Sequence, residues 1–241
     1  MISSSMARFD FAKIKKSFDK IGKGNVRLTQ SSLVLLQDIQ FNKSVYTFPV
    51  LENDNATGIQ PEEIRLNQND EFIVTEIGVY LAGKISQDAD QVPGLFYHTY
   101  NVYNEQSGAT NGQSLYDGFL RIAVNNIVYV DRFDLRKCEK YQRTQWAERN
   151  ATELNGSTRA SINMETDGNF PVAPMVVLSG SKKNEVQIYL DKAITSYSFA
   201  VVGNDAVSLT YNISKVAIIL RGMLGQNSSV YQGTSRLIKR K

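Results

Sequence analysis

The sequence predicts an all-β protein built as a β-sandwich, with a short amphipathic helix at its N-terminus. Most of the middle of the chain consists of short segments rich in β-branched and aromatic residues and separated by turn-forming residues, a pattern typical of strands. A chain of 241 residues falls within the range of a single large sandwich domain. Because each strand has an apolar face to bury, we expect the strands to form two facing sheets.

The predicted strands alternate apolar and polar residues or form short apolar runs, and they lie at residues 44–50, 71–81, 95–103, 118–124, 127–130, 175–178, 186–190, 197–202, 207–213 and 216–224. Asn125 and Asn126 predict a two-residue hairpin turn, because asparagine tolerates the left-handed conformation that such turns require. Gly78 predicts a bulge or bend within its strand.

The chain is predicted to have three parts: a basic N-terminal arm at residues 1–27, a β-sandwich domain at 28–224 and a basic C-terminal tail at 225–241. Within the domain, a polar insert at 150–174 is long enough to indicate a contact with neighbouring molecules.

Three further segments of the domain do not have the strand pattern. Residues 82–94 and 104–114 are rich in Gly, Ser, Asn, Gln and Asp, and they predict exposed loops. Residues 138–149 indicate a weak internal helix.

The apolar residues of the arm have helical spacing. Phe11, Ile14, Phe18 and Ile21 follow one another at intervals of three, four and three residues, which places them on one face of a helix. Lysines lie mostly away from this face. The pattern predicts a short basic amphipathic helix that docks by its apolar face on its own domain or on a neighbouring subunit, or that lies on a membrane or lines a cavity for nucleic acid.

Both ends of the chain are basic, whereas the middle is acidic. Residues 1–27 carry seven basic and two acidic residues, and residues 221–241 carry five basic residues and no acidic one. Such ends commonly bind nucleic acid or an anionic membrane, although solvated tails are often lysine-rich as well. The candidate polyanion-binding residues are Lys13, Lys15, Lys16, Lys20, Lys23, Arg236, Lys239, Arg240 and Lys241.

The sequence also indicates where the protein is made. Residues 1–5 lack the charged and apolar regions of a signal peptide, so synthesis in the cytoplasm without export is expected. Apolar runs such as 216–220 have the length of strands and are too short for membrane-spanning helices. A single cysteine, Cys138, excludes an internal disulfide and agrees with a reducing compartment.

We expect no catalytic site, metal site or cofactor, and therefore no enzyme. His98 is the only histidine, which excludes two-histidine metal motifs, and its position among aromatic residues of a strand favours a structural role. Basic neighbours of Cys138 could lower its pKa, but a nucleophilic cysteine also needs a base, and His98 is the only histidine that could serve.

The acidic residues do not form a recognisable site. Asp88 and Asp90 resemble a fragment of a calcium-binding loop without its glycine and terminal glutamate. Asp131 and Asp134 could in principle act as a glycosidase pair, but such pairs are usually surface charges. Neither a phosphate-binding P-loop nor a GxGxxG motif is present.

Three strand segments, 69–81, 115–122 and 218–224, resemble those of jelly-roll major capsid proteins of small icosahedral bacteriophages. A basic arm, a sandwich with long polar loops and a basic tail fit the same family. The resemblance implies one jelly roll with insertions, or a compact pair of rolls. It further implies a structural virion protein that assembles into a capsid, with basic arms that face the genome or an internal membrane.

The partners that this resemblance implies are copies of the same chain, other virion proteins, and nucleic acid or an internal lipid membrane, with no small-molecule substrate. The alternative is a carbohydrate-binding or adhesive β-sandwich, such as a phage fibre or decoration protein or a surface module. Tyr97, Tyr100, Tyr103 and Tyr116 would then form a platform for sugars.

Overall fold

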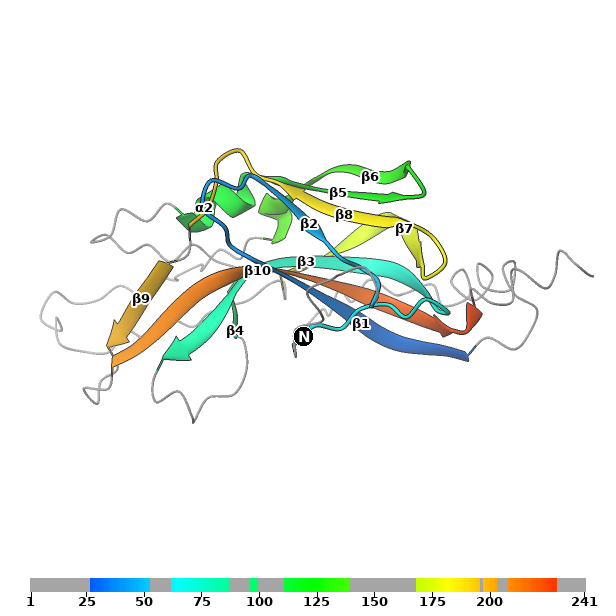
Figure 1. The fold of residues 1–241 in the computed structure, drawn as a ribbon, viewed down its shortest axis with the longest axis horizontal. Coiled ribbons are helices and arrows are strands. Elements are labelled where there is room, and N and C mark those ends of the chain that lie inside the picture. The colour runs from blue at the N-terminus through cyan, green and yellow to red at the C-terminus, as the bar shows by residue number, and fades with distance from the viewer. Residues whose placement is uncertain are drawn as a thin grey trace, which may run out of the picture.

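The computed structural model describes residues 27–52, 62–86, 96–98, 111–138, 168–195, 197–202 and 208–228. In these ranges the chain forms ten strands in two antiparallel sheets, with very little helix. The all-β, two-sheet prediction is therefore confirmed. Figure 1 shows the smaller sheet lying across the larger one.

The elements of secondary structure follow one another as β1 (Arg27–Asp38), β2 (Val45–Phe48), β3 (Glu71–Ser86), β4 (Phe96–His98), α2 (Asn111–Tyr116), β5 (Phe119–Val124), β6 (Ile127–Asp134), the 3-10 turn η1 (Leu135–Cys138), β7 (Asn169–Ser179), β8 (Asn184–Tyr189), β9 (Tyr197–Val202) and β10 (Ser208–Gln226).

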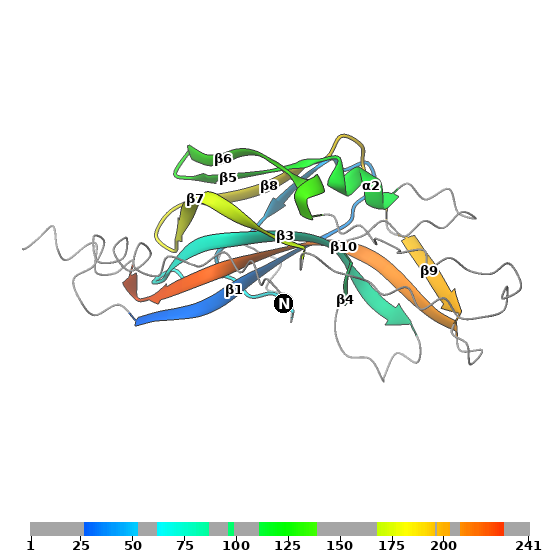
Figure 2. The same ribbon diagram turned by 180° about the vertical axis from the view of Figure 1, so that it is seen from behind.

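The larger sheet, sheet A, is organised around the two longest strands, β3 and β10, which pair with each other. On the outer side of β10, β1 pairs with the second part of the strand and β9 with the first part. On the outer side of β3, β7 and β4 pair with successive parts in the same way. The C-terminal part of β3 and the N-terminal part of β10 project beyond the smaller sheet, together with β4 and β9 (Figures 1 and 2).

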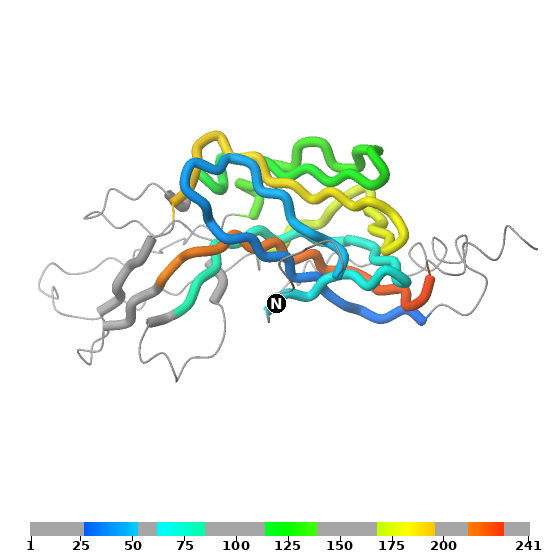
Figure 3. The backbone as a smooth tube through the Cα atoms, in the orientation of Figure 1, coloured from blue at the N-terminus to red at the C-terminus, as the bar shows by residue number. Residues whose placement is uncertain are grey.

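The smaller sheet, sheet B, has the order β2-β8-β5-β6. Together the two sheets contain a nested set of strand pairs, β1 with β10, β2 with β8, β3 with β7 and β5 with β6. Successive pairs alternate between sheets A and B. Figure 3 shows the chain leaving β1 in one sheet and entering β2 in the other. The nesting brings the first and last strands of the described chain side by side.

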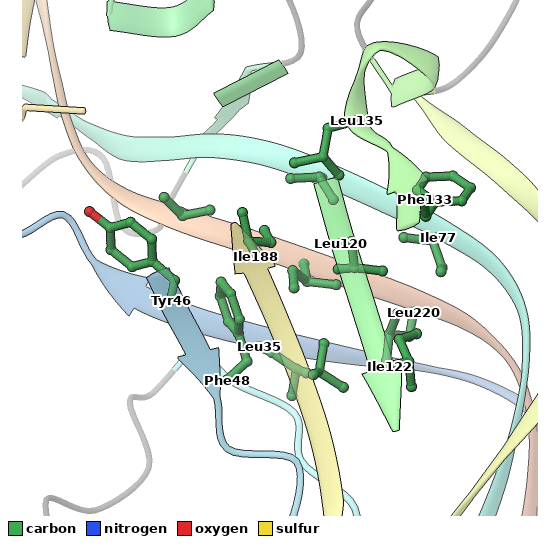
Figure 4. Close-up of a cluster of buried hydrophobic side chains, with 14 of the residues drawn as sticks. Leu35, Tyr46, Phe48, Ile77, Leu120, Ile122, Phe133, Leu135, Ile188 and Leu220 are labelled. Atoms are coloured by element: carbon green, nitrogen blue, oxygen red, sulfur yellow. The ribbon is translucent and has the colours of Figure 1, made fainter. Parts of the chain in front are cut away.

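The core lies between the two sheets. Leu35, Ile77 and Leu220 of sheet A meet Leu120 and Ile188 of sheet B, and all five are fully buried. Figure 4 shows these side chains pointing into the same layer. Burial of aliphatic side chains at this contact stabilises the fold by about 1.5–3 kcal/mol for each side chain.

Sheet A has apolar residues on its outer face as well. Along β1, Leu33 and Leu35 belong to the core between the sheets, while Val34 and Leu36 belong to a second cluster with Tyr80 and Ala217. All four of these β1 residues are buried. A strand that is buried on both faces has a continuous apolar run in place of alternation. This explains the sequence of residues 33–36 and of 216–220.

The structure corrects several predicted boundaries. The sequence indicated no strand before residue 44, yet β1 occupies 27–38, so strand structure begins at the last residue of the predicted arm. Polar Gln30, Ser31 and Ser32 hide the start of β1 because they alternate with few apolar residues. Residues 82–86 are the end of β3, and 111–116 form α2, so both predicted loops are shorter than expected.

The second half of the chain differs in a similar way. The predicted strands at 207–213 and 216–224 are one strand, β10, which continues to Gln226 and so into the predicted tail. The register of β10 against β3 shifts between Ile213 and Lys215, at the gap between the two predicted strands. The last part of the predicted insert, 169–174, belongs to β7. Pro171 and Pro174 suggested a loop, but prolines are tolerated on a strand at the margin of a sheet.

Gly78 does not form the bulge that was predicted. The register between β3 and β10 shifts near Thr75, between Arg221 and Gly222, where the Thr75 hydroxyl donates to the Arg221 carbonyl at 3.0 Å. Gly78 instead allows a close approach, because a Cβ there would lie 2.4 Å from Oδ1 of Asn169.

Several predictions fall outside the described residues. They include the N-terminal helix with Phe11, Ile14, Phe18 and Ile21, and almost all of the predicted helix at 138–149. Residues 150–167 of the insert and 229–241 of the tail are also outside.

Candidate assembly surface

The most exposed apolar run of the described chain is on β6, the last strand of sheet B. Ile127, Val128 and Tyr129 are consecutive and are 60%, 37% and 45% exposed. Among the described strands, β6 pairs with β5 alone, which leaves its other edge open. Figure 2 shows β6 at the margin of the sheet. An open apolar edge is a surface that another chain can cover.

Other edge strands of the sandwich have features that hinder pairing with another chain. Ile64 pairs with Val34 of β1 through two backbone hydrogen bonds of 2.9 Å, and this covers the middle of that edge. β2 has only four residues. β7 contains Pro171 and Pro174, which lack the N–H group that a pairing strand would need. In contrast, β6 has eight residues, no proline and no lysine.

β6 is not a regular edge along its whole length. Its register against β5 shifts near Leu120 and again near Ile122, so the strand is bulged around Tyr129 and around Asp131 and Arg132. Bulges twist an edge and interrupt regular pairing. The exposed run is therefore better suited to contacts through side chains than to addition of a further strand.

Hydrogen bonds hold the hairpin end of β6 in place. At the hairpin turn, Asn125 and Asn126 have φ values of 50° and 63°, as the predicted two-residue turn requires. The Asn125 N–H donates to the Lys183 carbonyl at 2.9 Å, and the Lys183 N–H donates to Oδ1 of Asn125 at 3.1 Å. These two bonds attach the hairpin tip to the turn before β8.

The outer face of sheet B carries a row of interacting side chains beside β6. The Arg132 guanidinium lies 4.9 Å from the centre of the Phe119 ring. Phe119 stacks on Tyr189 with a centroid distance of 4.9 Å and an interplanar angle of 7°. The Tyr189 hydroxyl donates to Oε1 of Gln187 at 2.8 Å. The row extends the exposed surface of β6 across neighbouring strands.

Cys138 is fully buried at the end of η1. Its Sγ lies 3.7 Å from the Ile77 carbonyl. Burial raises the pKa of the thiol to about 12, and this outweighs the opposing effects of a hydrogen bond with the Val79 backbone and of the Lys137 charge. At neutral pH the group is a thiol packed in the core, and its basic neighbours do not activate it.

The predicted acidic pair has local structural partners. Oδ1 of Asp134 accepts a hydrogen bond from the Arg136 N–H at 3.1 Å and so caps η1. Oδ1 of Asp131 lies 4.0 Å from Nε of Arg121, and the carboxylate is almost fully exposed. Within the described residues, no group of three or more His, Cys, Asp and Glu side chains could hold a metal ion.

The remaining candidate residues have different outcomes. His98 lies in β4, opposite Leu81 of β3, as the strand prediction implied. Tyr116 is fully buried, and its hydroxyl lies 3.4 Å from the Val79 carbonyl, so it cannot contribute to a sugar platform. All of the candidate polyanion-binding residues, together with Asp88, Asp90, Tyr100 and Tyr103, lie outside the described ranges.

No described helix has the length and apolar character needed to cross a bilayer. Comparison with known proteins gave no match to a family model, to a curated protein or to a solved structure.

Proposed function

We propose that this chain is a structural virion protein, a capsid subunit of a bacteriophage that assembles with copies of itself and has a jelly-roll fold. The observation that carries the proposal is the nested pairing of β1 with β10, β2 with β8, β3 with β7 and β5 with β6, alternating between two sheets. Jelly rolls of viral capsids have eight strands in two such sheets.

The strand orders support a single roll over a compact pair of rolls. Removing β4 and β9 leaves two four-stranded layers, β1-β10-β3-β7 and β2-β8-β5-β6. β4 and β9 pair with β3 and β10 beyond these layers, so they are additions to the same roll. Each of the eight remaining strands then has one place in the nested set.

The open β6 edge and the basic ends support the same function. A subunit of a shell needs apolar surface for its neighbours, and β6 offers three exposed apolar residues in a row. The basic arm and tail would face the packaged genome or an internal lipid membrane, where charge neutralisation needs no recognition of sequence. In this proposal the protein is made in the host cytoplasm and resides in the virion with other structural proteins.

The alternative of a carbohydrate-binding or adhesive module has less support, although lectins also use jelly rolls. A sugar platform needs a free aromatic face. Tyr116 is buried, and the Phe119 ring is covered by Tyr189 and Arg132.

Sedimentation velocity of the purified full-length chain over a range of concentrations, followed by negative-stain microscopy, tests the proposal. We expect concentration-dependent assembly into closed particles or their fragments. A chain that stays monomeric at high concentration in both low and high salt would contradict a capsid role. Binding to a glycan panel without self-association would support the alternative.

A further inference from the structure

We infer that the predicted N-terminal helix docks on the outer face of sheet A of its own chain, with its apolar residues against an apolar strip on that face. The apolar strip consists of Leu28, Ile73, Met175, Val177 and Met223, which form one cluster. Ile73 is 1% exposed, and the other four residues are partly buried. The inference does not depend on self-assembly. It names the docking surface of a segment that the sequence alone does not place.

The apolar strip lies on the side of sheet A that faces away from sheet B. On β3, Phe72 and Val74 belong to the core between the sheets, whereas Ile73 belongs to the strip. Successive side chains of a strand point to opposite faces, so Ile73 points away from the core. Figure 1 shows sheet B on the other side of sheet A. Among the described residues, the cluster around Ile73 contains residues of sheet A alone, so any apolar cover comes from outside the described ranges.

The apolar strip crosses the strands of sheet A. Met223 of β10 is the register partner of Ile73 of β3, and Ile73 is the register partner of Val177 of β7. Leu28 of β1 lies at the other end, because its register partner Gly225 is two residues from Met223 on β10. The four strands together span about 14 Å, since neighbouring strands lie about 4.8 Å apart.

Polar residues limit the strip in the direction of the strands. On one side of it, Arg221 of β10 and Glu76 of β3 are register partners, and Nη1 of Arg221 lies 3.9 Å from Oε2 of Glu76. On the other side, the register partners are Gly225 and Glu71. The face of an amphipathic helix therefore fits the strip across the strands and not along them.

The apolar face of the predicted helix matches the strip in length. Phe11 and Ile21, its first and last apolar residues, are ten positions apart, which corresponds to about 15 Å at 1.5 Å per residue. Lys16 and Lys20 lie on the opposite face of the same helix. Docking would therefore direct these lysines away from the sheet, so that the outer side of sheet A presents positive charge to a polyanion.

The connection to β1 favours the helix of the same chain. β1 begins one residue before Leu28, at one end of the strip. Residues 22–26 link Ile21 to β1 and span at most about 18 Å when extended. Gly22 and Gly24 allow this linker to turn back over the sheet. A short tether gives the helix an effective concentration in about the millimolar range at its own strip, above that of a second copy in dilute solution.

The linker also sets the direction of the docked helix. Ile21 is the apolar residue closest to the linker, so it would lie near Leu28 on β1. The helix would then cross β10 and β3, which brings Phe11 to Val177 on β7. This order distinguishes docking on the strip from a loose association of the arm with the domain.

Cysteine pairs test this order. In the full-length chain, Phe11→Cys/Val177→Cys should form an intramolecular link with a short bismaleimide reagent, identified by mass spectrometry of the digested protein. Ile21→Cys/Val177→Cys is the matched control and should link at least about tenfold more slowly, because its two positions lie at opposite ends of a strip about 14 Å long. The native thiol, Cys138, is buried and does not compete.

Trypsin gives an independent readout, because a docked helix is a poor substrate. Met223→Glu places a charge in the strip and should speed cleavage after Lys16 and Lys20 by at least about tenfold, since cleavage follows the population of the undocked arm. Gln226→Glu adds the same charge at an exposed position of the same strand and should leave the rate unchanged. Far-ultraviolet circular dichroism and urea unfolding should show that both variants keep the fold.

A second pair of substitutions changes the helix and leaves the sheet intact. Phe18→Glu alters the apolar face and should speed cleavage as Met223→Glu does. Ala12→Glu adds the same charge away from that face and should not. Equal rates for the parent and for Phe18→Glu would overturn the docking.

The remaining outcomes identify other positions of the arm. Covalent dimers of Phe11→Cys/Val177→Cys in place of the intramolecular link would overturn docking on the same chain and assign the strip to the arm of a second copy. Protection of the parent from trypsin only in the presence of vesicles of phosphatidylcholine and phosphatidylglycerol would overturn the inference in favour of a membrane. The capsid proposal is decided separately, by the assembly measurements.

Discussion

The carboxylate of Glu63 accepts a hydrogen bond from the backbone N–H of Leu36 at 3.1 Å, and it does so at the outer edge of sheet A. The same carboxylate group forms a 2.6 Å ion pair with Nη2 of Arg65, and both side chains are buried. Together with the backbone bridge between Val34 and Ile64, this arrangement closes the β1 edge. The absence of a similar cover on β6, within the described chain, is what distinguishes the two edges.

The first prediction concerns this ion pair. Glu63→Ala should lower the free energy of unfolding by about 3–5 kcal/mol, because it leaves the Arg65 guanidinium buried without its counter-charge. Among the residues that the structure describes, none forms a hydrogen bond with Nε or Nη1 of Arg65. The double variant Glu63→Gln/Arg65→Met should therefore lose less stability than Glu63→Ala alone. Urea unfolding measures both, and equal losses would contradict a role for the buried charge.

The second prediction concerns the pH dependence of stability. Burial raises the pKa of the Glu71 carboxyl, and this outweighs the opposing effects of Lys182 and of hydrogen bonds from Ser179 and Ser228. The folded state therefore holds the Glu71 proton more tightly than the unfolded state. As pH rises from 4.5, the ordinary pKa of a glutamate, through the higher pKa of the folded state, this group makes the protein progressively less stable.

Glu71→Gln mimics the protonated form and should remove that decline. The stability of the variant relative to the parent should increase between pH 4 and pH 8, as measured by urea unfolding at each pH. Glu52→Gln is the control, because it removes a carboxylate from an exposed position. A constant difference between Glu71→Gln and the parent across this range would show that the carboxyl is not destabilised by burial.

The third prediction concerns Cys138. With a pKa of about 12, only on the order of one thiol in ten thousand is ionised at pH 8, and the side chain is buried. A thiol reagent such as Ellman's reagent should react with none of the native protein within minutes and with one thiol per chain in urea. Rapid labelling of the native state would place the thiol at the surface and would reopen the question of a nucleophilic role.

The fourth prediction concerns the close contact between β10 and β3. A Cβ on Gly222 would lie 1.8 Å from the Ile73 carbonyl oxygen, which no side-chain rotation can relieve. Gly222→Ala should lower the free energy of unfolding by about 1–3 kcal/mol or more, because the two strands must separate. Gln226→Ala, at an exposed position on the same strand, should change it little. Equal stability of Gly222→Ala and the parent would mean that the strands are not so close.

The sequence determined much of this protein by itself. The all-β class, the two-sheet arrangement, the turn at Asn125 and Asn126 and most strand positions follow from local patterns of side chains, and the structure confirms them. These features depend on residues that are near in sequence, so local propensity and periodicity are sufficient. The composition likewise limits the histidines that could act as a base for Cys138 to one, His98.

Only the tertiary structure decided which apolar runs are buried. Residues 33–36 and 127–130 are both short apolar runs, yet the first is buried on both faces and the second is largely exposed. The difference depends on whether another part of the chain covers the strand, and Ile64 and Glu63 reach β1 from beyond β2. Strand pairing between the two ends of the chain is likewise a long-range property, which is why β1 and the full length of β10 could not be read from the sequence alone.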